Sequence, residues 1–218
     1  MTKFLALAVA GFVAVSVSQA SAASMTVTGN FGPTATDFSG LAFSVPGFNT
    51  TLGTLTSVSV TLSASANVGG SVTNNAPTAQ DFTVTTDSFV KVTSSTTSIN
   101  GITVDLNASQ SYSQVAGNGG TATYGPFIPS TTSASINGTP LSAFTSGPIS
   151  LTASTQSQTS ILGGGNNIAT AISSTASGTL TVTYNYTVPP PASVPEPASM
   201  ALLGMGLAGL GLIRRRRA

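Results

Sequence analysis

Carboxylates are the side chains in this chain best suited to acid–base chemistry, and there are few of them. The four aspartates are Asp37, Asp81, Asp87 and Asp105, and Glu196 is the single glutamate. The chain has no His, Cys or Trp. Ser-His-Asp and Cys-His catalysis, the usual zinc ligand sets and Trp platforms for sugars are therefore excluded. What remains is a pair of carboxylates, the arrangement that glycoside hydrolysis uses at a separation of roughly 5–9.5 Å.

Asp81 and Asp87 are the closest pair along the chain, six positions apart. On one strand without a bulge they share a face, but lie about 20 Å apart, too far for either glycosidase mechanism. A cross-strand pairing with Asp37 or Asp105 stays open. The same two residues are the nearest candidates for calcium, although no clustered D-x-D-x-D pattern supports such a site. We therefore expect no catalytic residue, no metal and no cofactor, with the aspartates in turns and on exposed strand faces.

The elements that must position these side chains are strands, because apolar and hydroxyl residues alternate. The alternation is clearest over Ser57–Ala66 and Thr179–Val188, and a period of two with β-branched residues predicts half-buried strands. Further strands are predicted at Met25–Thr28, Leu41–Val45, Ser71–Thr73, Phe82–Thr93, Ile102–Leu106, Thr121–Tyr124, Ser133–Ile136, Ile149–Ser157 and Ala169–Ala176. Turns are predicted at Gly69-Gly70, Asn100-Gly101, Asn118–Gly120, Asn137-Gly138 and Gly163–Asn166.

These strands, without intervening helices, predict an all-β antiparallel β-sandwich. Pro140–Ser146 is the one segment that suits a short helical turn. Gly163–Asn166 lacks the following Lys-Ser/Thr and the helix of a phosphate-binding loop, so it is a turn. Tyr184 and Tyr186 are expected to fill the core, with their hydroxyls at its margin.

The surface of this domain is built from hydroxyls rather than charges. Ser and Thr together make up about three residues in ten, and residues 24–188 carry four aspartates and Lys91, a net charge of −3. No basic surface is available for nucleic acid. A neutral surface gives little electrostatic protection against self-association, so the sheet edges are expected to be adhesive. Without cysteines, stability must come from packing and hydrogen bonds.

The N-terminus has the three parts of a secretory signal peptide. Lys3 is followed by the apolar stretch Phe4–Val15 and by the small residues Ala20, Ala22 and Ala23. We expect signal peptidase to cut after Ala22 or Ala23, with Ala20 the less favoured position. Residues 1–23 then form the signal peptide, and residues 24–188 form the exported domain.

The C-terminal segment concentrates what charge the chain has. After the Pro-rich linker 189–193 come Val194, Pro195, Glu196 and Pro197, then an apolar run, then Arg214, Arg215, Arg216 and Arg217. The run Ala201–Ile213 contains four glycines, and as a helix it rises only roughly 20 Å, against a hydrocarbon core of about 30 Å. We therefore expect a short transmembrane helix that anchors only transiently in a membrane, with the arginines as a cytoplasmic stop signal.

Residues 194–218 resemble the PEP-CTERM sorting signal in the order and spacing of all three parts. The resemblance implies a Gram-negative bacterium that makes extracellular polysaccharide, and processing at or near Pro195–Pro197 by an exosortase, a membrane cysteine transpeptidase-like enzyme. The expected destination is the cell surface or the extracellular matrix.

The exported domain resembles a second family, the choice-of-anchor E domain. The resemblance rests on Leu52–Val58, Phe82–Val84, Leu141–Thr145 leading into Ile149–Leu151, and Gly178–Thr187. It extends over most of Thr50–Val188 and implies a β-rich domain joined to a surface-sorting tail, with no known activity to transfer.

Together these features predict a non-enzymatic protein of the cell surface or of a polysaccharide biofilm matrix. The alternative is a carbohydrate-binding adhesin, which requires aromatic side chains on an exposed face. An ice-binding protein is less well supported, because the Thr-x-Thr motifs lack a regular spacing. A hydrolase requires two aspartates to converge in one cleft.

Overall fold

The computed structural model describes residues 20–95, 99–127, 132–190 and 203–207, together with residues 209, 211 and 213. The chain divides into a compact unit, Ala22–Val188, and a second unit made of Met1–Ser21 and Pro189–Ala218. All the strands described below lie in the compact unit, apart from the first residue of β1.

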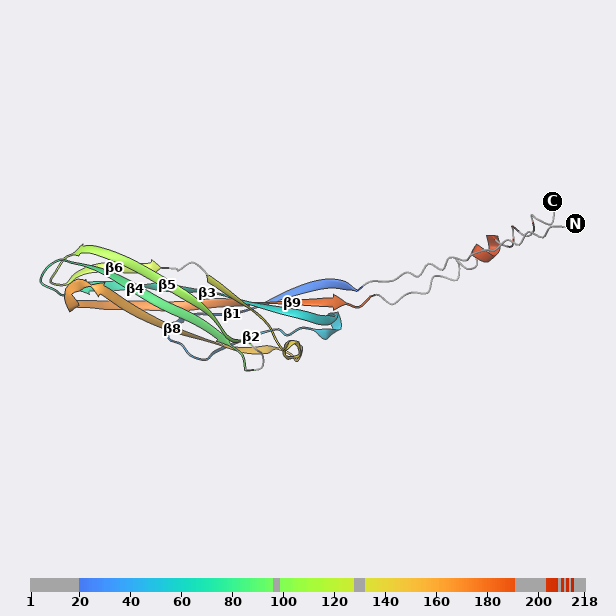
Figure 1. The fold of residues 1–218 in the computed structure, drawn as a ribbon. Coiled ribbons are helices and arrows are strands. Elements are labelled where there is room, and N and C mark those ends of the chain that lie inside the picture. The colour runs from blue at the N-terminus through green and yellow to red at the C-terminus, as the bar shows by residue number, and fades with distance from the viewer. Residues whose placement is uncertain are drawn as a thin grey trace. The chain divides into compact units, whose positions relative to one another are not determined.

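Two antiparallel sheets make up the compact unit (Figure 1). The first has the order β1-β9-β3-β6, with β7 also paired to β3; its strands are β1 Ser21–Ala35, β9 Ile168–Val188, β3 Thr54–Asn74, β6 Gly120–Phe127 and β7 Thr132–Asn137. The second has the order β2-β8-β4-β5; its strands are β2 Leu41–Val45, β8 Ile149–Gly163, β4 Gln80–Thr93 and β5 Asn100–Val115. The prediction of an all-β antiparallel fold is confirmed.

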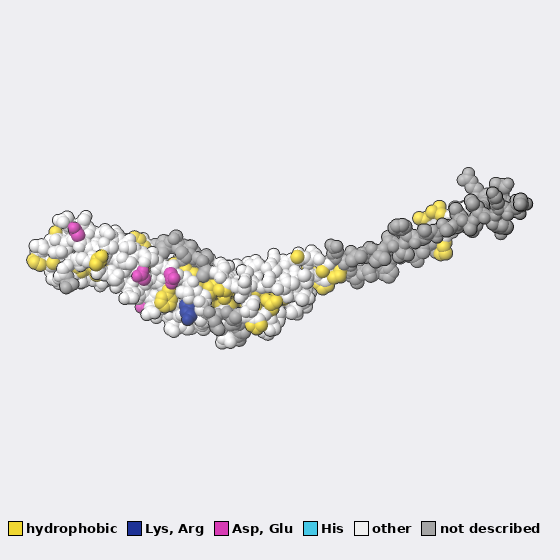
Figure 2. Space-filling view, in the orientation of Figure 1, with side chains coloured by type: hydrophobic (Ala, Val, Ile, Leu, Met, Phe, Trp, Pro, Cys, Tyr) yellow, Lys and Arg dark blue, Asp and Glu magenta, His cyan; other side chains and the backbone are white. Residues whose placement is uncertain are grey.

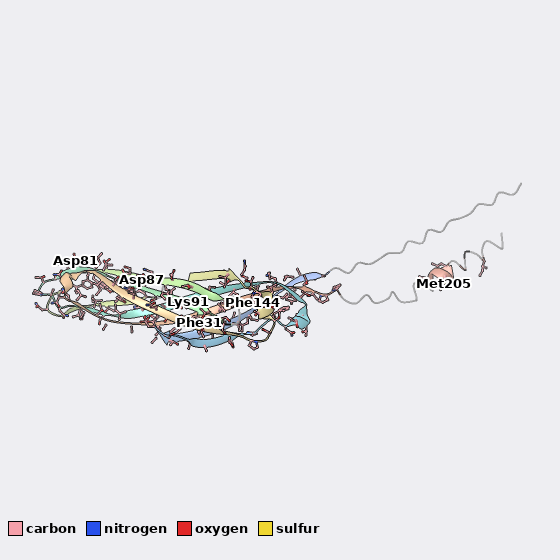
Figure 3. The ribbon with its side chains drawn as sticks, turned by 60° about the horizontal axis from the view of Figure 1, so that its bottom comes forward. Phe31, Asp81, Asp87, Lys91, Phe144 and Met205 are labelled. Atoms are coloured by element: carbon pink, nitrogen blue, oxygen red, sulfur yellow. The ribbon has the colours of Figure 1, made fainter. Side chains whose placement is uncertain are left out.

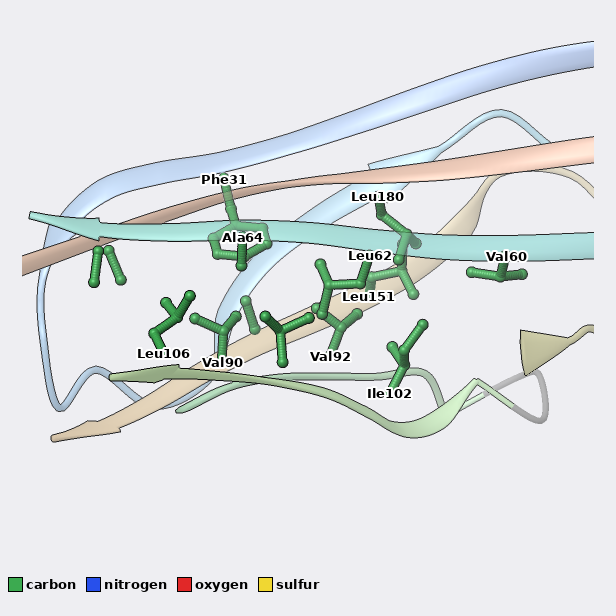
Figure 4. Close-up of a cluster of buried hydrophobic side chains, with 14 of the residues drawn as sticks. Phe31, Val60, Leu62, Ala64, Val90, Val92, Ile102, Leu106, Leu151 and Leu180 are labelled. Carbon is green, nitrogen blue, oxygen red and sulfur yellow. The ribbon is translucent and has the colours of Figure 1, made fainter. Parts of the chain in front are cut away.

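The core lies between the two sheets and follows from the alternation in the sequence. On β3, Val60, Leu62 and Ala64 are buried, whereas the residues between them are partly exposed. On β4, Val90 and Val92 are buried in the same way and meet the β3 side chains across the interface (Figure 4). Removing one face of each strand from water is the main source of stability for a chain without disulfides.

Most strands extend beyond their predicted bounds, and β3 and β9 each join two segments that the sequence predicts as separate strands. Gly69-Gly70 was expected to form a turn, but both glycines lie inside β3, and the ladder register shifts between Val68 and Gly70. The turn prediction was wrong because β9 pairs with β3 along its whole length, which holds the glycines extended as an irregularity in one strand. Gly178 likewise lies within β9, opposite Ala64. Asn100-Gly101 begins β5 rather than forming the turn alone.

Other local predictions are confirmed. A 3₁₀ turn spans Leu141–Phe144, and another spans Gly164–Asn166 between β8 and β9. Residues 117–119 form the turn between β5 and β6. A further 3₁₀ turn, Thr50–Leu52, precedes β3 and is capped by the side chain of Asn49.

Tyr184 fills the core as expected. Its side chain is fully buried, it packs against Phe48 and Phe144, and its hydroxyl donates a hydrogen bond of 2.8 Å to the carbonyl of Pro46. Burial raises the pKa of Tyr184 to about 12. Tyr186 is partly buried, with its ring centroid 5.1 Å from that of Phe48.

One edge of the second sheet is covered in a specific way. Strand β2 pairs with β8 only as far as Ala153, and beyond it the loop before β2 takes over. Asp37, at φ 66°, accepts a 2.6 Å hydrogen bond from the N–H of Ser157 and donates its own N–H to Thr155 Oγ1. Phe38 O accepts the N–H of Thr155. Within the described part of the chain, residues 158–163 of β8 pair with β4 alone. This segment of β8 is where the adhesive sheet edge predicted from the sequence would lie. The adhesion itself stays a prediction.

In the second unit, residues 203–207 are helical and exposed. Among the residues that the structure describes, no helix reaches the length and apolar character needed to cross a membrane.

Candidate functional site

The predicted processing residues lie mostly beyond the described part of the chain. The sorting motif Val194–Pro197, the arginines at 214–217 and the signal-peptide residues 1–19 fall outside it. Ala20 is exposed and precedes β1, whereas Ala22 and Ala23 are among the first residues of that strand. Both line a shallow hollow beside Thr56 and the end of β9. Cleavage after either residue therefore shortens β1 by a few residues and leaves the rest of it paired.

Two of the four aspartates have structural roles. Asp37 holds the loop before β2 against the edge of β8, as described above. Asp81 accepts a 2.6 Å hydrogen bond from the N–H of Gln114, which sits at φ 54° where the register between β4 and β5 shifts. Each carboxylate thus satisfies a backbone donor that the sheet ladder leaves free.

The pairing of Asp81 with Asp87, considered for calcium, is not supported by the structure. Both are exposed residues of β4, but they line different hollows, and Figure 3 shows them well separated along the strand. In the part of the chain that is described, no group of three or more His, Cys, Asp or Glu side chains comes close enough to hold a metal ion.

Asp87 and Asp105 do come together, on the outer face of the second sheet. They line one hollow of about 420 Å³. Its lining residues come from three adjacent strands: Asp87, Ser88 and Phe89 from β4, Asp105, Leu106 and Asn107 from β5, and Gln156 and Gln158 from β8. The hollow is open to solvent, and both carboxylates are exposed.

The strand register arranges these side chains as a grid around Phe89. In one row, Asp87 lies between Gln158 and Asn107. In the next, Phe89 lies between Gln156 and Asp105. Neighbouring strands are about 4.8 Å apart and alternate residues on one strand about 6.8 Å apart, so carboxylates and amides stand on several sides of one aromatic ring.

Phe89 differs from the other aromatic side chains in its surroundings. Every other described Phe and Tyr belongs to the buried core or packs against it. Phe89 is partly buried on the outer face, on the same side of β4 as Asp87 and Lys91. In the space-filling view, hydrophobic and acidic surface lie next to each other there, close to Lys91, the one lysine among the described residues (Figure 2).

The polar groups of the hollow are partly organised before any ligand binds. The amide of Asn107 donates a short hydrogen bond to Asp87 Oδ1. Lys91 lies one row beyond Phe89, between Thr103 and Ser154. Two carboxylates and one ammonium leave the local charge negative, which opposes the approach of anions.

A second hollow, about 580 Å³, lies near β2 and is lined largely by hydroxyl residues. Its aromatic member, Phe43, packs against the core, so the ring is committed to the fold. The hollow around Phe89 therefore combines an uncommitted aromatic ring with carboxylates and amides, and it is the better candidate site.

The sequence contains a signal for this site in the alternation along β4. On β4 the even-numbered positions from Phe82 to Val92 are buried, so Phe89 falls in the polar phase of the alternation. An aromatic residue out of phase with its own strand is a candidate for a role outside the core. The contributions of Gln156 and Asn107 depend on strand register, which the pattern alone does not give.

Comparison with known proteins identifies the C-terminal segment. Residues 193–217 match the family described as the PEP-CTERM protein-sorting motif. The chain therefore carries this sorting motif, which indicates an exported protein processed by exosortase. No curated protein matches the chain.

Among solved structures, similarity is found to proteins of infectious bursal disease virus. One is titled as the structure of the Gx strain, with 14% identity, 88% of this chain and 49% of that chain covered, and a TM-score of 0.20. Another is the VP2 subviral particle, with 15% identity, 86% and 49% coverage, and a TM-score of 0.21. The chain spans about half the length of these chains, and TM-scores this low assign neither a fold family nor a function.

Proposed function

We propose that this is a non-enzymatic protein of the cell surface or extracellular matrix, delivered there by exosortase sorting. The observation that carries the proposal is the PEP-CTERM motif over residues 193–217. It follows a compact domain, Ala22–Val188, whose two ends lie side by side: Thr26 of β1 bonds to Thr183 of β9, and β1 neighbours β9 in the sheet. Both ends can thus be cut without removing a central strand.

The proposed route uses both ends of the chain in turn. Signal peptidase removes residues 1–23 as the chain crosses the inner membrane of a Gram-negative bacterium. The short apolar segment before Arg214 then holds the protein in that membrane while exosortase cuts near Pro195–Pro197. The mature domain is released or attached within the extracellular polysaccharide, where it contributes to the surface layer or biofilm.

A passive role for the domain is supported by the placement of its carboxylates. Asp37 and Asp81 are bonded to backbone donors. Asp87 and Asp105 share a hollow, but this hollow is open, whereas a glycosidase encloses its acid in an apolar pocket. The resemblance to the choice-of-anchor E domain, which has no known activity, agrees with this role.

Processing can be tested in a cell that contains an exosortase. Deleting Pro195–Pro197 is expected to leave full-length protein in the inner membrane fraction, whereas deleting the three residues Pro189–Pro191 of the linker is the matched control and should leave cleavage intact. The two readouts are the mass of the C-terminal peptide and the cell fraction in which the protein is found. Unchanged cleavage after loss of Pro195–Pro197 would contradict the proposed route.

A carbohydrate-binding adhesin is the second candidate. It shares the same route and differs only in that the domain recognises a ligand. The specific observation that favours it is the hollow around Phe89.

A further inference from the structure

We propose that the hollow around Phe89 binds a neutral hexopyranose unit of a polysaccharide, with the Phe89 ring as its stacking platform. The inference deepens the proposed function, because it relies on the domain working in a polysaccharide layer. It assigns a ligand class and a set of residues to a surface that the sorting motif leaves undescribed.

The first argument is that the Phe89 ring is available. It is partly buried and lies outside the core cluster, and among the described residues no aromatic ring packs against it, unlike the paired rings Phe82–Tyr112 and Tyr124–Phe127. An apolar ring among carboxylate, amide and hydroxyl side chains exposes surface that a ligand can cover. The C–H face of a pyranose provides a flat apolar surface of suitable size, and burying both surfaces is favourable.

The second argument is the chemistry around the ring. Asp87 and Asp105 provide acceptors, and the amides of Asn107, Gln156 and Gln158 provide both donors and acceptors. Sugar hydroxyls both donate and accept, and they project from the edge of a pyranose whose face lies on the platform. The grid places these polar groups on different sides of Phe89, where the hydroxyls of a stacked ring point.

The third argument is charge, which selects among sugars. Two carboxylates and Lys91 give the hollow a net negative charge, so uronic acids and sulfated sugars are disfavoured. A carboxylate makes strong hydrogen bonds to neutral hydroxyls, since one partner of the bond is ionised. The expected ligand is therefore a neutral hexopyranose.

Binding can be measured with the full chain, purified in a mild detergent, on an array of neutral polysaccharides (dextran, laminarin and galactomannan) with alginate as the anionic comparison. We expect binding to at least one neutral polymer and none to alginate. Phe89→Ala should weaken it at least tenfold, and Phe89→Tyr should retain it. Leu162→Ala is the control, because Leu162 is the exposed apolar residue of β8, outside this hollow.

Asp105→Ala is a second variant on a different strand, and it is expected to weaken binding without altering the circular dichroism spectrum. Absence of binding to all three neutral polymers, equal binding by Phe89→Ala and the wild type, or preferential binding of alginate would each overturn the inference. Mass spectrometry would detect shortening of the bound polymer. Such shortening would also overturn the inference, because the hollow would then be a hydrolytic site. The proposed sorting route is tested separately by the processing assay, so failure of one does not imply failure of the other.

Discussion

Tyr184 provides a prediction whose size can be worked out from the structure. The change is Tyr184→Phe, which keeps the ring between Phe48 and Phe144 and removes only the hydroxyl that donates to Pro46 O at 2.8 Å. At pH 8 the loss leaves the carbonyl of Pro46 without this partner. We expect the free energy of unfolding to fall by about 1–2 kcal/mol.

The same hydroxyl makes this difference depend on pH. Burial raises the pKa of Tyr184 to about 12 in the folded state, against 10.0 when unfolded. Between these values the unfolded chain releases a proton that the folded chain keeps, so stability is fully present below pH 10 and is lost as pH rises to about 12. A pKa difference of two units corresponds to roughly 2.7 kcal/mol. Because the hydroxyl is at the margin of the core, we expect the contribution of this group to the free energy of unfolding to fall by about 2 kcal/mol over this pH range.

The assay is urea unfolding of the wild type and Tyr184→Phe at pH 8, 10, 11 and 12. The other titrating groups, including Tyr112, whose pKa is raised by burial and then by Tyr124, contribute equally to both proteins and cancel. The advantage of the wild type should shrink steadily above pH 10 and be nearly abolished or reversed by pH 12. A difference that stays constant from pH 8 to 12 would refute the assignment.

Two further predictions concern stability. Leu62→Ala leaves a cavity at a fully buried position in β3 and should lower the free energy of unfolding by about 2–5 kcal/mol. Leu162→Ala, at a residue that is 80% exposed, should change it by less than about 0.5 kcal/mol. Calorimetry measures both variants, and equal effects would contradict the placement of the core. Asp37→Ala removes the acceptor of the Ser157 N–H and should lower the free energy of unfolding by about 1–3 kcal/mol. Hydrogen exchange at the Ser157 amide should become faster. Unchanged exchange there would show that the loop does not protect the edge of β8.

Much of the fold follows from alternation, and particular residues show where that reasoning stops. The predicted bounds of the strand Leu41–Val45 agree with those in the structure, because the alternation of apolar and polar residues changes at both of its ends. Gly69-Gly70 misled the prediction because glycine marks turns in general, whereas here the paired strand β9 determines its conformation. Local propensity was overruled by a long-range ladder, which a single sequence does not display.

The candidate site likewise has features that the sequence predicts and features that depend on strand pairing. The phase of Phe89 within β4 is readable from the sequence, and so is its neighbour Asp87. The approach of Asp105 and Gln156 is not, because it depends on which strands pair and in what register, and a shift by one residue would move each side chain to the other face. The sorting motif was recognisable because its parts are contiguous in the sequence.

The side-by-side ends of β1 and β9 have a mechanical consequence. Strand β9 leads directly to the tail and is paired with β3 from Thr187 to Ile168, a length of roughly 65 Å. A pull on the chain beyond Val188 acts along this strand, so its hydrogen bonds to β3 are loaded together in shear rather than opened one after another. The domain thus has its most extended ladder at the point where a tether would transmit force.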